Sequence, residues 1–151
     1  MIPDPYYLQR FIEGQKSNYA AALQELRAGE KRTHWMWYIF PQIAGLGGSP
    51  MSRLYAISGR AGARAYWEHP VLGARLRECT EAVLKLEGRT VEQIFGYPDH
   101  VKFRSCMTLF EAATEDAAIF RAALLKYCDG EPDQRTLDIL KGQRGQLTPK
   151  I

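Results

Sequence analysis

The segment from Thr33 to Gln42 carries the residue types in this chain that are best suited to form a site. It reads THWMWYIFPQ, with four aromatic rings and one histidine between two polar ends. We expect so apolar a segment to be interior, where the polar atoms of His34 and Gln42 need partners. His34 could then be a general acid or base, and the alternative is a core histidine with satisfied nitrogens. Trp35 and Trp37 should point apart, one into the core and the other into a pocket wall.

A second group of candidates lies on the helix predicted to begin at Asp99. At 100° per residue, Lys102, Ser105 and Thr108 fall on one broad, mostly apolar face, while Met107 points to solvent. One interpretation is an anion site in which Lys102 supplies charge and Ser105 a hydrogen bond. In the other, Lys102 extends to water and the two hydroxyl groups bond back to main-chain carbonyls.

The glycine-rich loop that begins at Gly45 offers a weaker candidate. It contains neither GxxxxGK[ST] nor GxGxxG, the two common phosphate-binding patterns. Ser49 could cap a short helix whose free amide groups attract an anion, with Ser52 and Arg53 nearby. The alternative is a hinge between two closely packed helices.

Metal, cofactor and thiol chemistry are not predicted. The histidines and cysteines are scattered along the chain: His34, His69, His100, Cys79, Cys106 and Cys128. No HExxH motif or cysteine pair gives metal-ligand spacing, and Cys106 falls on a buried helix face, where a thiol is inert. Because the cysteines are odd in number and unpaired by spacing, we expect free thiols and a cytoplasmic protein.

The charge balance argues against a broad nucleic-acid-binding face. The chain has 20 basic and 17 acidic residues, and three basic residues with no acid lie in 141–151. The other 140 residues are therefore balanced at 17 of each sign, without the basic excess that nucleic acids select. No apolar run is long enough for a membrane span, and the N-terminus does not resemble a signal peptide, so we expect no membrane partner.

Apolar periodicity, capping residues, glycines and prolines predict helices throughout and no strand. The expected helices are 6–13, 17–28, 33–40, 51–57, 60–68, 70–87, 90–95, 99–113, 115–127 and 133–141, the sixth being the longest. Their expected caps include Asp4, Thr33, Thr90 and Asp99. The predicted fold is all-α, a single domain over residues 1–141 with short and medium helices packed irregularly around one core. Residues 142–151 are predicted to form a loose basic tail.

Several strings of residues together resemble one family of small, mostly bacterial proteins. They are His34 to Gln42, Gly45-Leu46-Gly47, Ser52, Tyr55-Ala56-Ile57, His69 to Gly73, Lys102 and Ser105 to Phe110. The family is the domain of unknown function DUF1810, and the resemblance runs from about residue 6 to residue 141. It implies an all-helical fold but no reaction. The label "calpastatin" that some members carry does not fit, because calpastatin inhibitory segments belong to long disordered chains. The family pattern marks His34, Trp35, Gln42, Ser52, Lys102, Ser105 and Thr108.

These observations favour a pocket for a small anionic or nucleotide-like ligand. Segment 34–42 would form one wall and loop 45–53 the rim. The predicted ligand-binding residues are Trp35, Gln42, Ser52, Lys102, Ser105 and Thr108. A first alternative is a hydrolase or glycohydrolase acting on a phosphorylated metabolite, with His34 moving protons and Lys102 stabilising negative charge. A second is a protein-interaction adaptor without a pocket.

Overall fold

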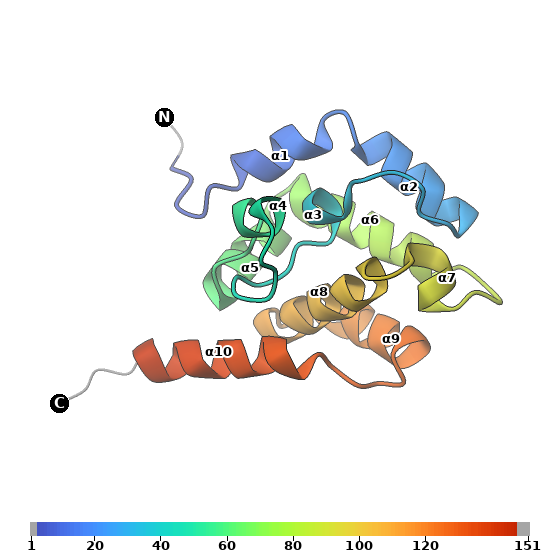
Figure 1. The fold of residues 1–151 in the computed structure, drawn as a ribbon. Coiled ribbons are helices and arrows are strands. Elements are labelled where there is room, and N and C mark those ends of the chain that lie inside the picture. The colour runs from blue at the N-terminus through green and yellow to red at the C-terminus, as the bar shows by residue number, and fades with distance from the viewer. Residues whose placement is uncertain (1–2, 148–151) are drawn as a thin grey trace.

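Ten helices account for most of residues 3–147, the part of the chain that the computed structural model describes (Figure 1). They are α1 (Gln9–Gln15), α2 (Tyr19–Ala28), α3 (Met36–Ile39), α4 (Pro50–Leu54), α5 (Arg60–Glu68), α6 (Leu72–Leu84), α7 (Val91–Phe95), α8 (Asp99–Ala113), α9 (Ala118–Tyr127) and α10 (Gln134–Leu147). Over this range the fold is a single all-helical domain without strands, as predicted. None of these helices is both long and apolar enough to cross a membrane.

Helix α8 lies at the centre of the fold and packs against α5, α7, α9 and α10 (Figure 1). Its neighbours lie on nearly every side, so even Met107 is 0% exposed. The prediction that Met107 faces solvent was wrong, because neighbouring helices cover the side of α8 that the projection left open, and the exposed apolar residue of α8 is Val101, in its first turn. This central position fixes Lys102 relative to the helices around it.

Three phenylalanines join the ends of α3, α7 and α8. The ring of Phe40 packs edge-on against Phe95 and Phe103, with centroids 5.7 and 5.1 Å away. Phe95 and Phe103 stack on each other with centroids 4.7 Å apart. Such pairs are each worth about 0.5–1.5 kcal/mol beyond the area they bury. They hold the short helix α3, which carries Trp37, against the helix that carries Lys102.

A buried polar network ties α1 to α5 and α6, and no sequence pattern pointed to it. Gln15 is only 1% exposed. Its Nε2 donates to the carbonyl oxygen of Tyr38 at 2.8 Å and to the hydroxyl of Tyr66 at 3.2 Å. Arg75 Nη1 donates to Gln15 Oε1 at 3.1 Å, so both ends of the amide have partners. Burial raises the pKa of the fully buried Tyr66 well above its usual value, and its hydroxyl stays protonated.

The helix boundaries follow the sequence where a local signal decides them. Helices α5 and α8 have the predicted limits, and Thr90 caps α7 as expected, accepting from the amide of Gln93 at 3.1 Å. Helix α1 begins later than predicted, because Tyr7 has a left-handed φ of 50°. Asp4 still stabilises the start of α1, because the Asp4 carboxylate accepts from the amides of Leu8 at 2.7 Å and Gln9 at 3.0 Å.

Other boundary predictions were wrong. Thr33 and Asp99 do not cap helices; Trp35 and Pro98 occupy those positions, and neither forms a side-chain cap. Helix α6 has 13 residues and is shorter than α8, which has 15. Helix α10 continues to Leu147, beyond the predicted start of a loose tail at residue 142, and residues 148–151 of that tail lie outside the described range.

The segment between α3 and α5 is a loop closed at its base. Ile43 and Ile57 form an isolated parallel bridge, in which Ala44 N donates to Ile57 O and Ile57 N to Gln42 O, both at 2.8 Å. Helix α4 lies within this loop, and Ser49 caps it by accepting from the amide of Ser52 at 3.1 Å. The bridge holds the loop against the end of α3.

Candidate functional site

Two adjoining cavities lie between the end of α3 and the first half of α8. The first is a narrow slot of ≈ 10 Å³, room for about one water molecule, with Trp37, Gln42, Ser52, Tyr55 and Lys102 among its lining residues. The second is open and measures ≈ 220 Å³, and its lining includes Gln42, Tyr97, Val101, Lys102, Ser105 and Arg135. Because Gln42 and Lys102 line both, we treat the cavities as one feature, the Lys102 groove.

Lys102 is partly buried at the junction of the two cavities. Its side chain is 24% exposed, and its Nζ lies 3.5 Å from Asp99 Oδ1. The same Nζ lies 5.8 Å from the centroid of the Trp37 ring, within reach of a cation–π interaction. Lys102 is thus held at the groove by a carboxylate on one side and an indole on another.

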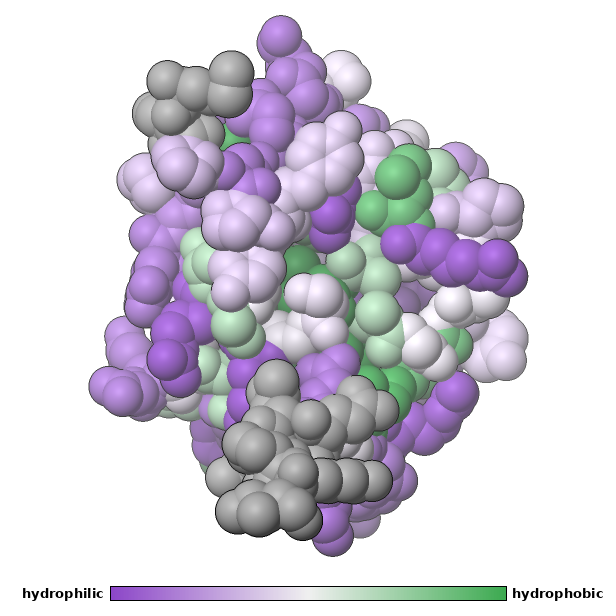
Figure 2. Space-filling view, turned by 90° about the vertical axis from the view of Figure 1, so that its left-hand side faces the viewer, coloured by the Kyte–Doolittle hydropathy of each residue, from purple (hydrophilic) through white to green (hydrophobic). Residues whose placement is uncertain are grey.

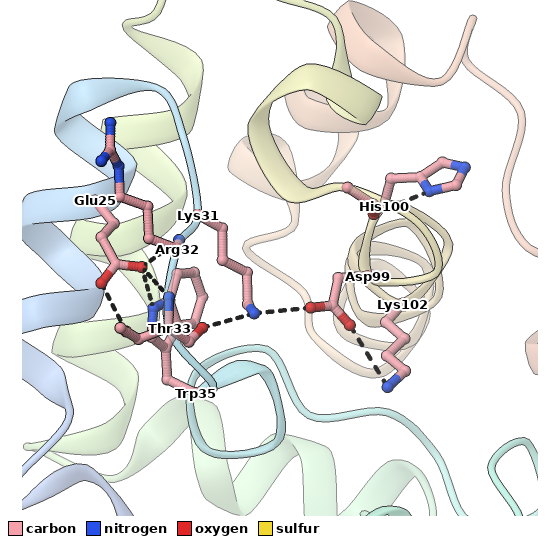
Figure 3. A network of polar contacts seen from close by, with 9 residues as sticks. Glu25, Lys31, Arg32, Thr33, Trp35, Asp99, His100 and Lys102 are labelled. Atoms are coloured by element: carbon pink, nitrogen blue, oxygen red, sulfur yellow. Dashed lines mark hydrogen bonds and ion pairs between the residues drawn. The ribbon is translucent and has the colours of Figure 1, made fainter.

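Asp99 is shared between two lysines (Figure 3). Its Oδ2 lies 2.9 Å from Lys31 Nζ, and the side chains of Lys31 and Asp99 are only 8% and 18% exposed. Lys31 Nζ also donates to the carbonyl oxygen of Thr33 at 2.7 Å. Two cations and one carboxylate leave this half-buried network with a formal charge of +1. We name it the Lys31–Asp99–Lys102 network.

Glu25 fixes the segment that joins α2 to α3 (Figure 3). Its Oε1 accepts from the amides of Arg32 at 2.7 Å and Thr33 at 2.9 Å, and from Trp35 Nε1 at 2.9 Å. Its Oε2 accepts from the hydroxyl of Thr33 at 2.6 Å. Burial alone would raise the pKa of Glu25, but these hydrogen bonds, that of the Thr33 hydroxyl foremost, outweigh it and lower the pKa to about 2.

The two tryptophans of this segment have different surroundings, as predicted. Trp35, predicted to contact the ligand, is fully buried with its indole N–H bound to Glu25, and it lines neither cavity of the Lys102 groove. Trp37 does line the groove. Its Nε1 is buried and has no hydrogen-bond partner within residues 3–147. An unpartnered buried donor of this kind is unusual in a folded protein.

Ser105 and Thr108 bond back to the main chain, as the second interpretation of their helix predicted. Ser105 Oγ donates to Val101 O at 3.1 Å and Thr108 Oγ1 to Arg104 O at 2.8 Å. Ser105 Oγ also lies 3.1 Å from Asp133 Oδ2, and the amide of Asp133 donates to Thr108 Oγ1 at 2.8 Å. Both hydroxyls therefore anchor the residue that precedes α10. Of the two, only Ser105 also lines the groove.

His34 is exposed and lines neither cavity of the Lys102 groove, so the expectation that it is interior was wrong. The other histidines serve local structure. The amides of Val71 and Leu72 donate to His69 Nδ1 at 3.1 and 3.2 Å, at the junction of α5 and α6. His100 Nδ1 lies 3.2 Å from Gly96 O. Across residues 3–147, no group of three or more His, Cys, Asp or Glu side chains is placed to hold a metal ion.

The three cysteines are free thiols. Burial raises the pKa of Cys106 well above its usual value, in agreement with the predicted inert core thiol. Burial likewise raises the pKa of Cys79 to about 12 and that of Cys128 to about 11. At neutral pH these groups are protonated and poor nucleophiles.

Two further cavities lie beside α5. One, of ≈ 300 Å³, lies between α5 and α10, on the side of the molecule where Figure 2 shows hydrophobic side chains in a hollow with hydrophilic ones around it. The other measures ≈ 310 Å³ and is lined in part by Trp67. Arg60 Nη1 and Arg64 Nε donate to the carbonyl oxygens of Ala112 and Ala113, at 2.6 and 3.4 Å. These bonds hold both arginines at the C-terminal end of α8, where a cation is favourable, although Arg60 Nε is buried without a hydrogen-bond partner among the described residues.

Comparison with known proteins gives a family and a close structural relative. A family described as "Protein of unknown function (DUF1810)" matches residues 5–140. The crystal structure of the conserved hypothetical protein Rv1873 from Mycobacterium tuberculosis is 48% identical in sequence, with a TM-score of 0.90, and the match covers 91% of this chain and 99% of that one. No functionally curated protein matches the chain.

Proposed function

The chain belongs to the DUF1810 family of proteins of unknown function, and on that premise we propose a function from the site alone: it binds a small anionic ligand in the Lys102 groove. The ligand has one flat ring and an anionic group. The anion binds beside Lys102, and the ring lies in the open part of the groove, where Tyr97 is 86% exposed.

The observation that carries this proposal is the shared carboxylate. Lys31 and Lys102 both pair with Asp99, so one positive charge stays uncompensated next to a cavity. A half-buried charge without a full partner is unfavourable, and a ligand anion provides the missing partner. The Trp37 ring lines the slot and lies 5.8 Å from Lys102 Nζ, so it forms the aromatic wall beside that charge.

The two alternative functions have less support. A hydrolase built on His34 requires that residue at the groove, and it lies outside the lining. An adaptor without a pocket predicts that Lys102 extends into bulk water, whereas its side chain is 24% exposed and held by Asp99. Ligand binding is the function that uses the partly buried charge of Lys102 and the cavity beside it.

The first test is a thermal-shift and calorimetric screen with nucleotides, phosphorylated metabolites, nicotinamide compounds and aromatic acids. A specific ligand at 100 times its Kd stabilises the native state by about 2.7 kcal/mol, which raises Tm by several degrees. Lys102→Ala should weaken binding of any such ligand by roughly tenfold or more, because it removes the charge at the groove. The matched control is Lys16→Ala, an exposed lysine at the end of α1 that lines neither cavity of the Lys102 groove.

We expect Lys16→Ala to bind like the wild type. Equal affinity in Lys102→Ala and wild type would place binding elsewhere, and a panel without any hit would contradict ligand binding. If no compound in the panel binds, the protein-interaction adaptor becomes the better proposal, and the next experiment is the capture of protein partners.

A further inference from the structure

We propose that the Lys31–Asp99–Lys102 network selects ligands that carry a single negative charge, and that Lys31 sets this preference without lining the groove. This inference rests on the proposed function and adds to it the charge of the ligand. It also assigns a role in specificity to Lys31, a residue outside the Lys102 groove.

The geometry divides Asp99 between the two lysines (Figure 3). Each carboxylate oxygen faces one ammonium group, Oδ2 at 2.9 Å from Lys31 and Oδ1 at 3.5 Å from Lys102. Lys31 has further contacts that hold it in place, since its Nζ donates to Thr33 O at 2.7 Å and lies 5.1 Å from the centroid of the Trp35 ring. Asp99 therefore cannot neutralise Lys102 fully while Lys31 holds its other oxygen.

Other charged and polar groups near the groove do not change the formal charge of +1. Asp133 and Arg135 both line its open end and cancel formally. The carboxylate of Asp133 is also engaged, because Thr136 N and Thr136 Oγ1 donate to it at 3.1 and 2.5 Å. The first amides of α8 are used as well: His100 N donates to Gly96 O at 2.9 Å, and Val101 N to Pro98 O at 3.0 Å. The formal charge presented to a ligand is thus +1.

A ligand with one negative charge makes the groove and ligand neutral together. Carboxylates and phosphodiesters meet this condition, whereas a phosphate monoester carries about −1.5 to −2 at pH 7 and leaves an excess negative charge. In a partly desolvated site that excess is unfavourable. The preferred chemistry is a flat ring joined to a singly charged acid.

Two pairs of probes separate charge from shape. Benzoate and phenyl phosphate share a ring, and 3′,5′-cyclic AMP and AMP share a nucleoside, but in each pair the second member carries the extra charge. Their affinities are measured by NMR titration, following the indole N–H of Trp37 in ¹⁵N spectra, with Trp37→Phe to assign that signal. Wild type should bind the singly charged member of at least one pair roughly threefold or more tightly, as expected for a partly exposed ion pair.

Three variants change the formal charge of the network in a known way. Asp99→Asn makes it +2 and should reverse the preference towards the doubly charged probe. Lys31→Met makes it 0 and should weaken both probes by threefold or more, although Lys31 does not line the groove. The double variant Lys31→Met/Asp99→Asn returns the charge to +1 and should recover the wild-type preference. Lys16→Met is the control and should leave the preference unchanged.

Each other result overturns the inference. The same ratio of affinities in wild type and in Asp99→Asn would show that charge does not select the ligand, while binding itself stands. A double variant that resembles Asp99→Asn would show the same. If neither probe pair moves the Trp37 signal in any folded variant, the proposed function fails together with the inference. Circular dichroism and Tm establish that each variant is folded before titration.

Discussion

The carboxylate of Glu25 is the residue-scale contact that holds the approach to the groove, and its effect should depend on pH. Its folded-state pKa of about 2 lies below the ordinary value of 4.5. A lowered pKa stabilises the fold fully above the unfolded value, and this stabilisation is lost as pH falls from 4.5 towards 2. Glu25→Gln should therefore cost about 1–2 kcal/mol at pH 7 and much less near pH 2.5.

Urea unfolding of wild type and Glu25→Gln between pH 2.5 and 7 measures this difference. The control is Glu81→Gln, an exposed glutamate on α6, which should unfold with the wild type at pH 7. A difference between wild type and Glu25→Gln that does not change with pH would contradict the role given to the ionised carboxylate.

Gln15 should be among the residues least tolerant of an apolar replacement. Its buried side-chain amide forms hydrogen bonds with Arg75, with the Tyr66 hydroxyl and with the carbonyl of Tyr38. Gln15→Leu has a similar size but removes the partner of Arg75 Nη1. It also leaves the Tyr66 hydroxyl and the Tyr38 carbonyl with only the 3.3 Å hydrogen bond between them, and each lost bond costs about 1–3 kcal/mol. We expect a loss of about 2–4 kcal/mol in the free energy of unfolding, measured by urea denaturation.

Gln24→Leu on the exposed side of α2 is the matched control and should change stability by less than about 0.5 kcal/mol. If both variants lose equal stability, the buried network is not what the glutamine contributes.

The residues in and around the Lys102 groove show how much of a site can be predicted from a sequence. The aromatic segment and Lys102 could be chosen because charged or polar groups among apolar neighbours are visible in the chain itself. Lys31 and Asp99 could not, since their pairing joins two segments that are far apart in sequence. Asp99 also sits where a helix cap is the ordinary interpretation, and nothing local distinguishes a cap from an ion pair.

At the scale of elements, the contact between α5 and α6 depends on a glycine. A Cβ at Gly73 would lie 1.9 Å from the carbonyl oxygen of Trp67, and a backbone atom cannot move aside as a side chain does. Gly73→Ala should therefore cost about 2 kcal/mol or more by overpacking, with a lower Tm.

Gly142→Ala in α10 is the comparison, because a Cβ there meets nothing within 4 Å among the described residues. A glycine in an exposed helix interior is unfavourable, so this change should raise stability by about 0.5–1 kcal/mol. Similar effects in both variants would mean that the close approach of α5 and α6 is not needed.

Helix limits were predictable where a cap, a glycine or a proline decides them, as for α5, α7 and α8. They were not predictable where tertiary contacts decide. Helix α1 starts late because of the left-handed Tyr7, and Thr33 binds Glu25 rather than capping α3. Sequence signals describe competition within a few residues, and these outcomes are set by a neighbouring helix.

For the whole molecule, packing around α8 predicts how the thiols react. Cys79 and Cys106 are fully buried, and Cys128, with a pKa of about 11 against an ordinary 9.0, has a thiolate fraction roughly 100-fold lower than a free thiol at the same pH. A disulfide reagent at pH 8 should therefore label the native protein slowly and at Cys128 first, while denaturant exposes all three thiols at once.

Cys128→Ser should remove the slow native labelling and leave two thiols in denaturant. Rapid labelling of native Cys128→Ser would show that the core around α8 opens more readily than its burial implies.

The closed loop between α3 and α5 has a consequence for how this protein can change over evolution. The bridge between Ile43 and Ile57 fixes both ends of the loop, and Gly48 near its tip is exposed with free space around it. Insertions or deletions at this tip would leave the bridge and the core in register, since exposed loop tips tolerate them. Related proteins could therefore lengthen or shorten the rim of the groove, and so change which ligands fit, while keeping Lys102 and the helices beneath it unchanged.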